Sequence, residues 1–231
     1  MITLTGVSKW YDSGGSQNSH RVLDQLHLHL NQGEFLYIIG GTGAGKSTLL
    51  KMIATEDRPS QGRVQLFGYD LDLVSPPTLK AIRQVIGYVP QDIRLLSDFT
   101  VFENIAVSLS LAGKRSIQKN AKQKINEILE KLGLIQKRNQ LARVLSGGEA
   151  QKVAVARALI RAPEVIVADE PTGAQDPDST WSLMDLLIRA NDSGVTTLIA
   201  THDRQIVKRI RKSCATLKQG RVSREENVCF Y

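Results

Sequence analysis

The sequence predicts an α/β fold in which a mixed sheet core carries an antiparallel β subdomain and an α-helical subdomain. Alternating apolar and polar residues at 2–7 and 22–30 indicate antiparallel strands near the start of the chain. Helical spacing of apolar residues dominates from about Gln91 to Arg161. From Glu164 onward strand patterns and helix patterns alternate, which is typical of a parallel sheet with crossover helices.

The remaining elements follow from local signals in chain order. The apolar run FLYII predicts a buried strand, and STLLKMIA predicts the helix after it. Turn residues flank a strand within residues 57–70, and Pro76 with Pro77 begins a short helix. The last part of the chain is predicted to form a strand at 165–169, a helix at 178–190, a strand at 195–202, a helix at 204–212 and a hairpin at 214–222.

A glycine-rich segment, GGTGAGKST, follows the first buried strand and fits the pattern G-x-x-x-x-G-K-[S/T]. Its glycines let successive N–H groups point inward at a helix start, where amide donors and the helix dipole both attract phosphate. Lys46 would reach the β- and γ-phosphates of ATP, and the Ser47 hydroxyl would bind Mg2+. The expected nucleotide-binding residues of this phosphate loop are Gly40, Gly41, Thr42, Gly43, Ala44, Gly45, Lys46, Ser47 and Thr48.

Two carboxylates end the apolar strand pattern VIVADE. Ligands of open α/β sheets collect at the carboxyl ends of strands, and Asp169 and Glu170 are predicted to emerge there. Asp169 would hold Mg2+, and Glu170 would polarise a water for attack on the γ-phosphate. The alternative interpretation is that this acidic pair only caps the next helix.

The segment LSGGE precedes a run with helical apolar spacing. Ser146, Gly147, Gly148 and Glu149 would therefore lie at a helix N-terminus, whose amides attract anionic oxygens. The same letters also describe an ordinary helix start, with Ser146 as N-cap and Glu149 three residues later.

Taken together, these motifs resemble those of the ATP-binding-cassette (ABC) ATPases, whose signature segment LSGGE matches letter for letter. The resemblance extends from Met1 to about Arg221. It implies one nucleotide-binding domain over residues 1–231. Approximately residues 1–90 and 162–231 would form the core with its antiparallel β subdomain, and approximately 91–161 the helical subdomain.

The resemblance further implies a Mg2+-dependent ATPase that works as a homodimer. The signature of one subunit would close over the nucleotide of the other, so that Ser146 and Gly148 contact the γ-phosphate in trans. It also assigns roles to four residues outside the motifs above. Gln91 would sense Mg2+ and γ-phosphate, His202 would hydrogen-bond the γ-phosphate, Asp176 would communicate across the dimer, and Tyr11 would stack on adenine, with Trp10 as a competitor.

The expected location is the cytoplasmic side of the inner membrane. No run approaches the roughly 20 apolar residues of a membrane span, and the two cysteines suggest no disulfide framework. The net charge is +7. Basic residues concentrate around 114–143 and 203–212. The favoured interpretation is a solvated surface, and the alternative is attraction to an anionic membrane surface. Nucleic acid is an unlikely partner because aromatic residues are only 5% of the chain and no reading motif is present.

A lone cassette of this kind would act through a separate integral membrane protein, docked in the cleft beside Gln91. Within the family the chain is most similar to the bacterial cell-division branch, which implies a partner of FtsX type. The lipoprotein-release and macrolide-export ATPases are close alternatives. A soluble ABC ATPase is the alternative of another class. The dimer-interface loop departs from the family pattern because Gln175 stands where leucine is common.

Overall fold

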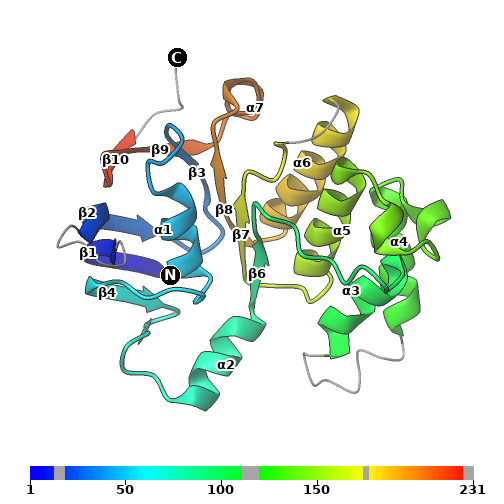
Figure 1. Ribbon diagram of the computed structural model, residues 1–231, viewed down its shortest axis with the longest axis horizontal. Helices are drawn as coiled ribbons and strands as arrows, with labels where there is room; N and C mark the ends of the chain where they lie inside the picture. The colour runs from blue at the N-terminus through cyan, green and yellow to red at the C-terminus, as the bar shows by residue number, and fades with distance from the viewer. Residues whose placement is uncertain (13–18, 111–119, 174–176, 226–231) are drawn as a thin grey trace.

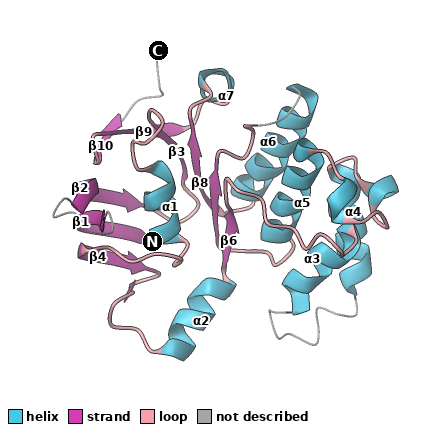
Figure 2. Cartoon of the chain, in the orientation of Figure 1, coloured by secondary structure: helices cyan, strands magenta, loops and turns pink. Residues whose placement is uncertain are grey.

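The computed structural model describes residues 1–12, 19–110, 120–173 and 177–225. Within these ranges the strands form two sheets (Figures 1 and 2). The antiparallel sheet has the order β2 (Ser19–Leu30), β1 (Ile2–Asp12), β4 (Gln61–Leu66), β5 (Tyr69–Asp70). The second has the order β10 (Arg221–Glu225), β9 (Ser213–Lys218), β3 (Phe35–Ile39), β8 (Thr196–Thr201), β7 (Val165–Asp169), β6 (Ile86–Val89). The predicted α/β fold class is confirmed.

The second sheet is mixed because only the pairing of β10 with β9 is antiparallel. Strands β9, β3, β8, β7 and β6 run parallel. The register aligns Ile39 with Thr201, Asp169 with Ala200 and Val89 with Ala168. Their carboxyl ends therefore meet at one edge of the sheet, which is where the chain continues into the predicted site residues.

Helix α1 (Lys46–Ile53) lies between the two sheets (Figure 1). Its buried side chains Leu49, Leu50, Met52 and Ile53 share one core with inward residues of both sheets. Burial of this apolar helix face fixes where its N-terminus lies, and the phosphate loop is attached to that end.

Most of the other helices gather on the opposite side of the mixed sheet (Figure 2). Helices α5 (Gly147–Leu159), α6 (Pro177–Asp192) and α7 (Arg204–Arg209) contribute to a core against β3, β7 and β8. Helices α3 (Val101–Ser110), α4 (Ala121–Lys131) and α5 share a third core. The short helices η2 (Ile135–Lys137) and η3 (Ala142–Val144) connect α4 to α5, while α2 (Pro76–Gln84) lies apart, leading into β6.

Two local expectations were wrong. Residues 91–100 are turns and extended segments rather than helix, and they are held by bonds such as that from the Leu96 N–H to Asn104 Oδ1, at 2.9 Å. Helix α7 ends at Arg209 instead of continuing to Lys212. The chain must leave the helix there because β9 begins at Ser213 and pairs with β3.

Within the described ranges, no helix is long and apolar enough to cross a membrane. The cysteine expectation needs a correction, because Cys214 is disulfide-bonded in the structure. Its partner lies outside the described residues. Cys214 itself is fully buried in β9.

Candidate active site

The phosphate loop joins the end of β3 to the start of α1. Gly45 is the N-cap of α1 and has a φ of 101°, which favours glycine. A Cβ at Gly45 would lie 2.8 Å from Leu23 Cδ2. Gly40 is constrained differently, because its backbone lies against the Leu217 carbonyl of β9 and leaves no room for a side chain. The loop path thus depends on both glycines.

Replacing Gly45 with alanine should destabilise the fold and impair ATP binding. The alanine backbone would be strained at this positive φ, and its Cβ would overlap the Leu23 side chain. The expected loss of unfolding free energy is about 1–3 kcal/mol. Thermal melting checks this. Gly41→Ala is the matched control, since a Cβ there would meet nothing within 4 Å. Equal melting temperatures for the two variants would contradict the role given to Gly45.

The ammonium of Lys46 is buried inside the loop. Its Nζ donates to the carbonyl oxygens of Gly40 at 2.9 Å and Gly41 at 3.3 Å, and it lies 3.5 Å from Glu170 Oε1. Only 8% of Lys46 is exposed, so its charge is balanced by these oxygens. Phosphate oxygens entering the loop could take their place as acceptors.

Asp169 ends β7 and is almost fully buried, at 1% exposed. Burial raises the pKa of its carboxyl group, although a hydrogen bond from Ser47 opposes the shift. Its Oδ1 is buried without a hydrogen-bond partner. A hydroxyl beside a carboxylate with an unused oxygen is a hard oxygen donor set, which fits Mg2+.

Glu170 follows with its backbone in the left-handed region, at a φ of 47°. Such strain in a non-glycine residue is typical of functional sites. His202 Nδ1 lies 2.8 Å from Glu170 Oε1, and the His202 N–H donates to Oε2 at 3.3 Å. The carboxylate is thus held between a buried lysine and an exposed histidine, and 9% of its side chain remains accessible.

Gln91 lies at the same edge of the sheet. It follows β6 and Pro90, and its side chain is exposed. The register of β6 with β7 brings the start of this segment alongside the strand that ends at Asp169. Its role as a sensor of Mg2+ and γ-phosphate stays a prediction.

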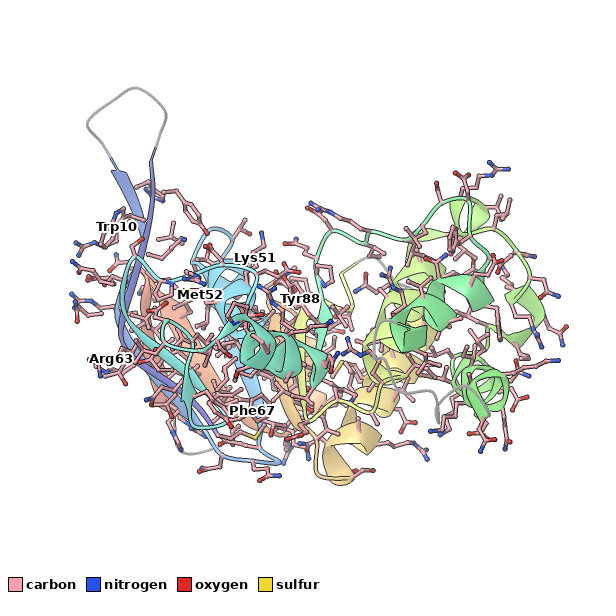
Figure 3. All side chains as sticks on the ribbon, turned by 90° about the horizontal axis from the view of Figure 1, so that it is seen from below. Trp10, Lys51, Met52, Arg63, Phe67 and Tyr88 are labelled. Carbon is pink, nitrogen blue, oxygen red and sulfur yellow. The ribbon has the colours of Figure 1, made fainter. Side chains whose placement is uncertain are left out.

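Tyr11 extends from β1 toward the start of α1. Its hydroxyl hydrogen-bonds Thr48 and donates to Asp57 Oδ2 at 2.6 Å. Lys9 lies 4.9 Å from the ring centroid and also donates to Asp57, at 2.5 Å. Tyr11 is 43% exposed, so it offers an accessible aromatic residue beside the phosphate loop. Trp10, labelled in Figure 3, comes from the same strand.

The signature segment forms the N-terminus of α5. Ser146 and Glu149 make a reciprocal capping box, with the Ser146 N–H donating to Glu149 Oε2 at 3.0 Å. Lys137 forms an ion pair with Glu149, and this bond lowers the pKa of the carboxyl group. Ser146 and Gly147 are exposed. The capping interpretation is therefore correct, and it leaves the outer surface of the segment open.

The structure does not bring all predicted residues into one place. Helix α1 packs in the core between the sheets, whereas α5 packs in the two cores on the far side. Within the chain the phosphate loop, Asp169, Glu170 and His202 converge, and the signature lies on a separate part of the fold (Figure 1). Asp176 and Gln175 lie outside the described residues.

Two contributors carry no sequence signal. Asp57, in a turn distant in sequence, accepts hydrogen bonds from Lys9 and Tyr11 of β1. Lys137, in η2, forms the ion pair with Glu149. Neither belongs to a motif, because each acts through a contact that only the folded chain creates. The arrangement as a whole places a cation, a carboxylate and an imidazole around one glycine-rich loop, and these groups suit phosphoryl transfer to water.

Comparisons with known proteins agree with this chemistry. The ABC transporter family model matches residues 23–173. The cell division ATP-binding protein FtsE of Mycobacterium tuberculosis is 41% identical over all of this chain and 98% of its own length. The methionine import ATP-binding protein MetN 1 of Bacillus thuringiensis is 40% identical over 97% of this chain and 66% of its own. The dimeric ATP-binding cassette MJ0796, solved in a post-hydrolysis state with ADP and Pi, superposes with a TM-score of 0.90 at 33% identity over the whole of both chains.

Proposed function

The chain belongs to the ABC transporter family, and we propose that it is the Mg2+-dependent ATPase subunit of a bacterial inner-membrane complex that acts in cell division. The observation that carries this proposal is the convergence of Lys46, Asp169, Glu170 and His202 around the phosphate loop. Residues 91–161 are proposed to act as its helical subdomain and the rest as its core.

Each side chain has a separate task in the proposed reaction. Lys46 would leave the Gly40 and Gly41 carbonyls to bind phosphate oxygens of ATP. Glu170 would accept a proton from the attacking water, and His202 would donate to the γ-phosphate. Ser47, Asp169 and Gln91 would hold Mg2+, which supplies positive charge against the phosphate oxygens.

The working form is proposed to be a homodimer with two shared sites. The exposed Ser146 and Gly147 support this, because they are open to solvent at the end of a helix that packs in other cores than α1 does. The dimeric cassette at 33% identity supports it further. On this proposal Ser146, Gly147, Gly148 and Glu149 complete the nucleotide site of the partner subunit, and Asp176 communicates between the two.

The cell-division role rests on the similarity to FtsE over the full chain. It implies an FtsX-like integral membrane partner and a peripheral location on the cytoplasmic face. Contact with an anionic lipid surface stays the alternative to a solvated face for the basic residues around 114–143 and 203–212. The similarity to a methionine import ATPase makes solute import the second candidate. In both cases dimer closure on ATP would move a membrane subunit docked beside Gln91.

The experiment is ATP hydrolysis with and without the membrane partner reconstituted in lipid. A binding partner shifts a conformational equilibrium toward the state that it binds better. A membrane partner that binds the closed dimer better than the open one should therefore raise kcat, because the closed dimer is the form proposed to hydrolyse ATP. An FtsX-like protein should stimulate hydrolysis, and the membrane subunit of a methionine importer should not. Stimulation by the importer subunit alone would favour the second candidate. No response to either would contradict a membrane-coupled role.

A further inference from the structure

Strand β1 and the turn after α1 meet in a polar cluster that no motif describes. Lys9 Nζ donates to Asp57 Oδ1 at 2.5 Å and to the Arg58 carbonyl at 2.8 Å. The Tyr11 hydroxyl donates to the other carboxylate oxygen, Asp57 Oδ2, at 2.6 Å. One carboxylate thus holds two side chains of the same strand. Lys9, Tyr11 and Asp57 are called the tyrosine cluster below.

The charged members of the tyrosine cluster are partly buried. The side chain of Lys9 is 12% exposed and that of Asp57 is 23% exposed. Burial acts to raise the pKa of Asp57, but hydrogen bonds from Lys9 and Tyr11 outweigh it and hold this pKa below its usual value. Asp57 is therefore ionised at neutral pH. Its hydrogen bonds are charge-assisted, which is the stronger kind, so the Tyr11 side chain is restrained before any nucleotide binds.

Helix α1 contacts the tyrosine cluster near both of its ends. Near its start, Thr48 hydrogen-bonds the Tyr11 hydroxyl. In its last turn, the Lys51 carbonyl accepts hydrogen bonds from the N–H groups of Glu56, at 2.8 Å, and Asp57, at 3.3 Å. These bonds place the turn that carries the carboxylate. Because the same helix begins at the phosphate loop, one element sets the position of the Tyr11 ring relative to that loop.

Lys9 leaves the two faces of the Tyr11 ring unequal. Its Nζ lies 4.9 Å from the ring centroid, which is a cation–π contact. Lys9 and Tyr11 are two residues apart in β1 and share one face of the strand, whereas Trp10 (labelled in Figure 3) belongs to the other face. The ammonium lies against one face of the ring, so a planar base has the opposite face on which to stack.

We propose that Asp57 is the positioning residue of the adenine site: it fixes the Tyr11 ring and holds Lys9 against one face, so that adenine stacks on the other. This inference rests on the proposed function and on the role predicted there for Tyr11. Asp57 acts through Tyr11 and does not touch ATP. A side chain that is already immobilised loses less freedom when the ligand binds. Asp57 should therefore strengthen recognition of the base and not of the phosphates.

The test compares the binding of ATP with that of tripolyphosphate, which has the phosphate chain without the base. Asp57→Ala and Tyr11→Phe should each raise the Kd for ATP by about two- to tenfold, the usual effect of one unrestrained side chain. The Kd for tripolyphosphate should not change. Tyr11→Phe keeps the ring and removes only the hydroxyl of an exposed residue, so it should fold even if Asp57→Ala does not.

A control and a double variant complete the experiment. Asp185→Ala also removes a carboxylate from an ion pair, with Arg189 at 2.7 Å, but it does so on α6 and should leave both affinities at the wild-type value. In Asp57→Ala/Tyr11→Phe the loss of ATP affinity should be smaller than the product of the single losses, because residues that share an interaction are not additive.

Three results would overturn the inference. They are wild-type ATP affinity of Tyr11→Phe, single losses that multiply in the double variant, and equal weakening of ATP and tripolyphosphate binding. The last would assign the tyrosine cluster to the stability of the phosphate loop. Tyr11→Ala tests the premise separately, since wild-type ATP affinity in this variant would refute the adenine role of Tyr11 itself. Failure of the wild-type chain to bind ATP would instead refute the proposed function.

Discussion

Replacing Glu170 with glutamine should lower kcat by about 10²–10⁴-fold, the usual contribution of a general base, while ATP binding persists. Glutamine keeps the shape of glutamate and can still bond His202, but its amide cannot take a proton from water. The neutral side chain also removes the carboxylate that lies 3.5 Å from Lys46. Lys46 would then remain free to bind phosphate, so the ATP affinity should not fall.

Phosphate release and equilibrium ATP binding are the two measurements for this variant. Glu164→Gln is the matched control, because Glu164 is exposed at the opposite end of β7 and the chemical change is the same. The left-handed backbone at Glu170 is retained by glutamine, so the two variants should have similar melting temperatures. Unchanged phosphate release from Glu170→Gln would refute its role as the base.

Replacing Lys46 with alanine should abolish measurable ATP binding. Hydrogen bonds to charged groups contribute about 1.5–3 kcal/mol each, so losing two of them raises Kd by about 10²-fold or more. In the chain without nucleotide, the Lys46 ammonium contacts only the Gly40 and Gly41 carbonyls and the Glu170 carboxylate. None of these contacts joins distant parts of the core, so the fold should survive their loss. The expected defect is therefore in binding and not in the fold.

Thermal melting with and without ATP measures both properties together. A ligand that binds only the folded state raises the melting temperature, and this rise should disappear in Lys46→Ala. Lys51→Ala should keep the rise, because Lys51 is exposed in the last turn of the same helix (Figure 3). A wild-type ATP affinity for Lys46→Ala would remove the assignment of the phosphate loop.

The parts of the fold that the sequence predicted well are those with a local cause. The run FLYII became β3 because an all-apolar strand must be buried on both faces, and its burial is nearly complete. The final hairpin turns at Gln219 and Gly220 as expected, with φ values of 51° and 75° that suit a tight two-residue turn. Ser75 caps α2 just before the two prolines that begin it.

What the sequence could not supply depends on long-range pairing. The order of the mixed sheet places β3 between β8 and β9, which are more than 150 residues later in the chain. That order brings His202 within 2.8 Å of Glu170. The partners of Tyr11 and Glu149 were missed for the same reason, since Asp57 and Lys137 have ordinary sequence surroundings.

The central claim is that two copies of the chain complete each other's nucleotide site. The most direct test mixes Lys46→Ala protein with Ser146→Arg protein and measures phosphate release. Each variant alone should be inactive, but a mixed pair contains one site with an intact phosphate loop and an intact signature. In a two-fold symmetric dimer at equal mixing, activity should return to about a quarter of the wild-type rate. Full activity of Ser146→Arg alone, or a mixture as inactive as its components, would contradict the shared site.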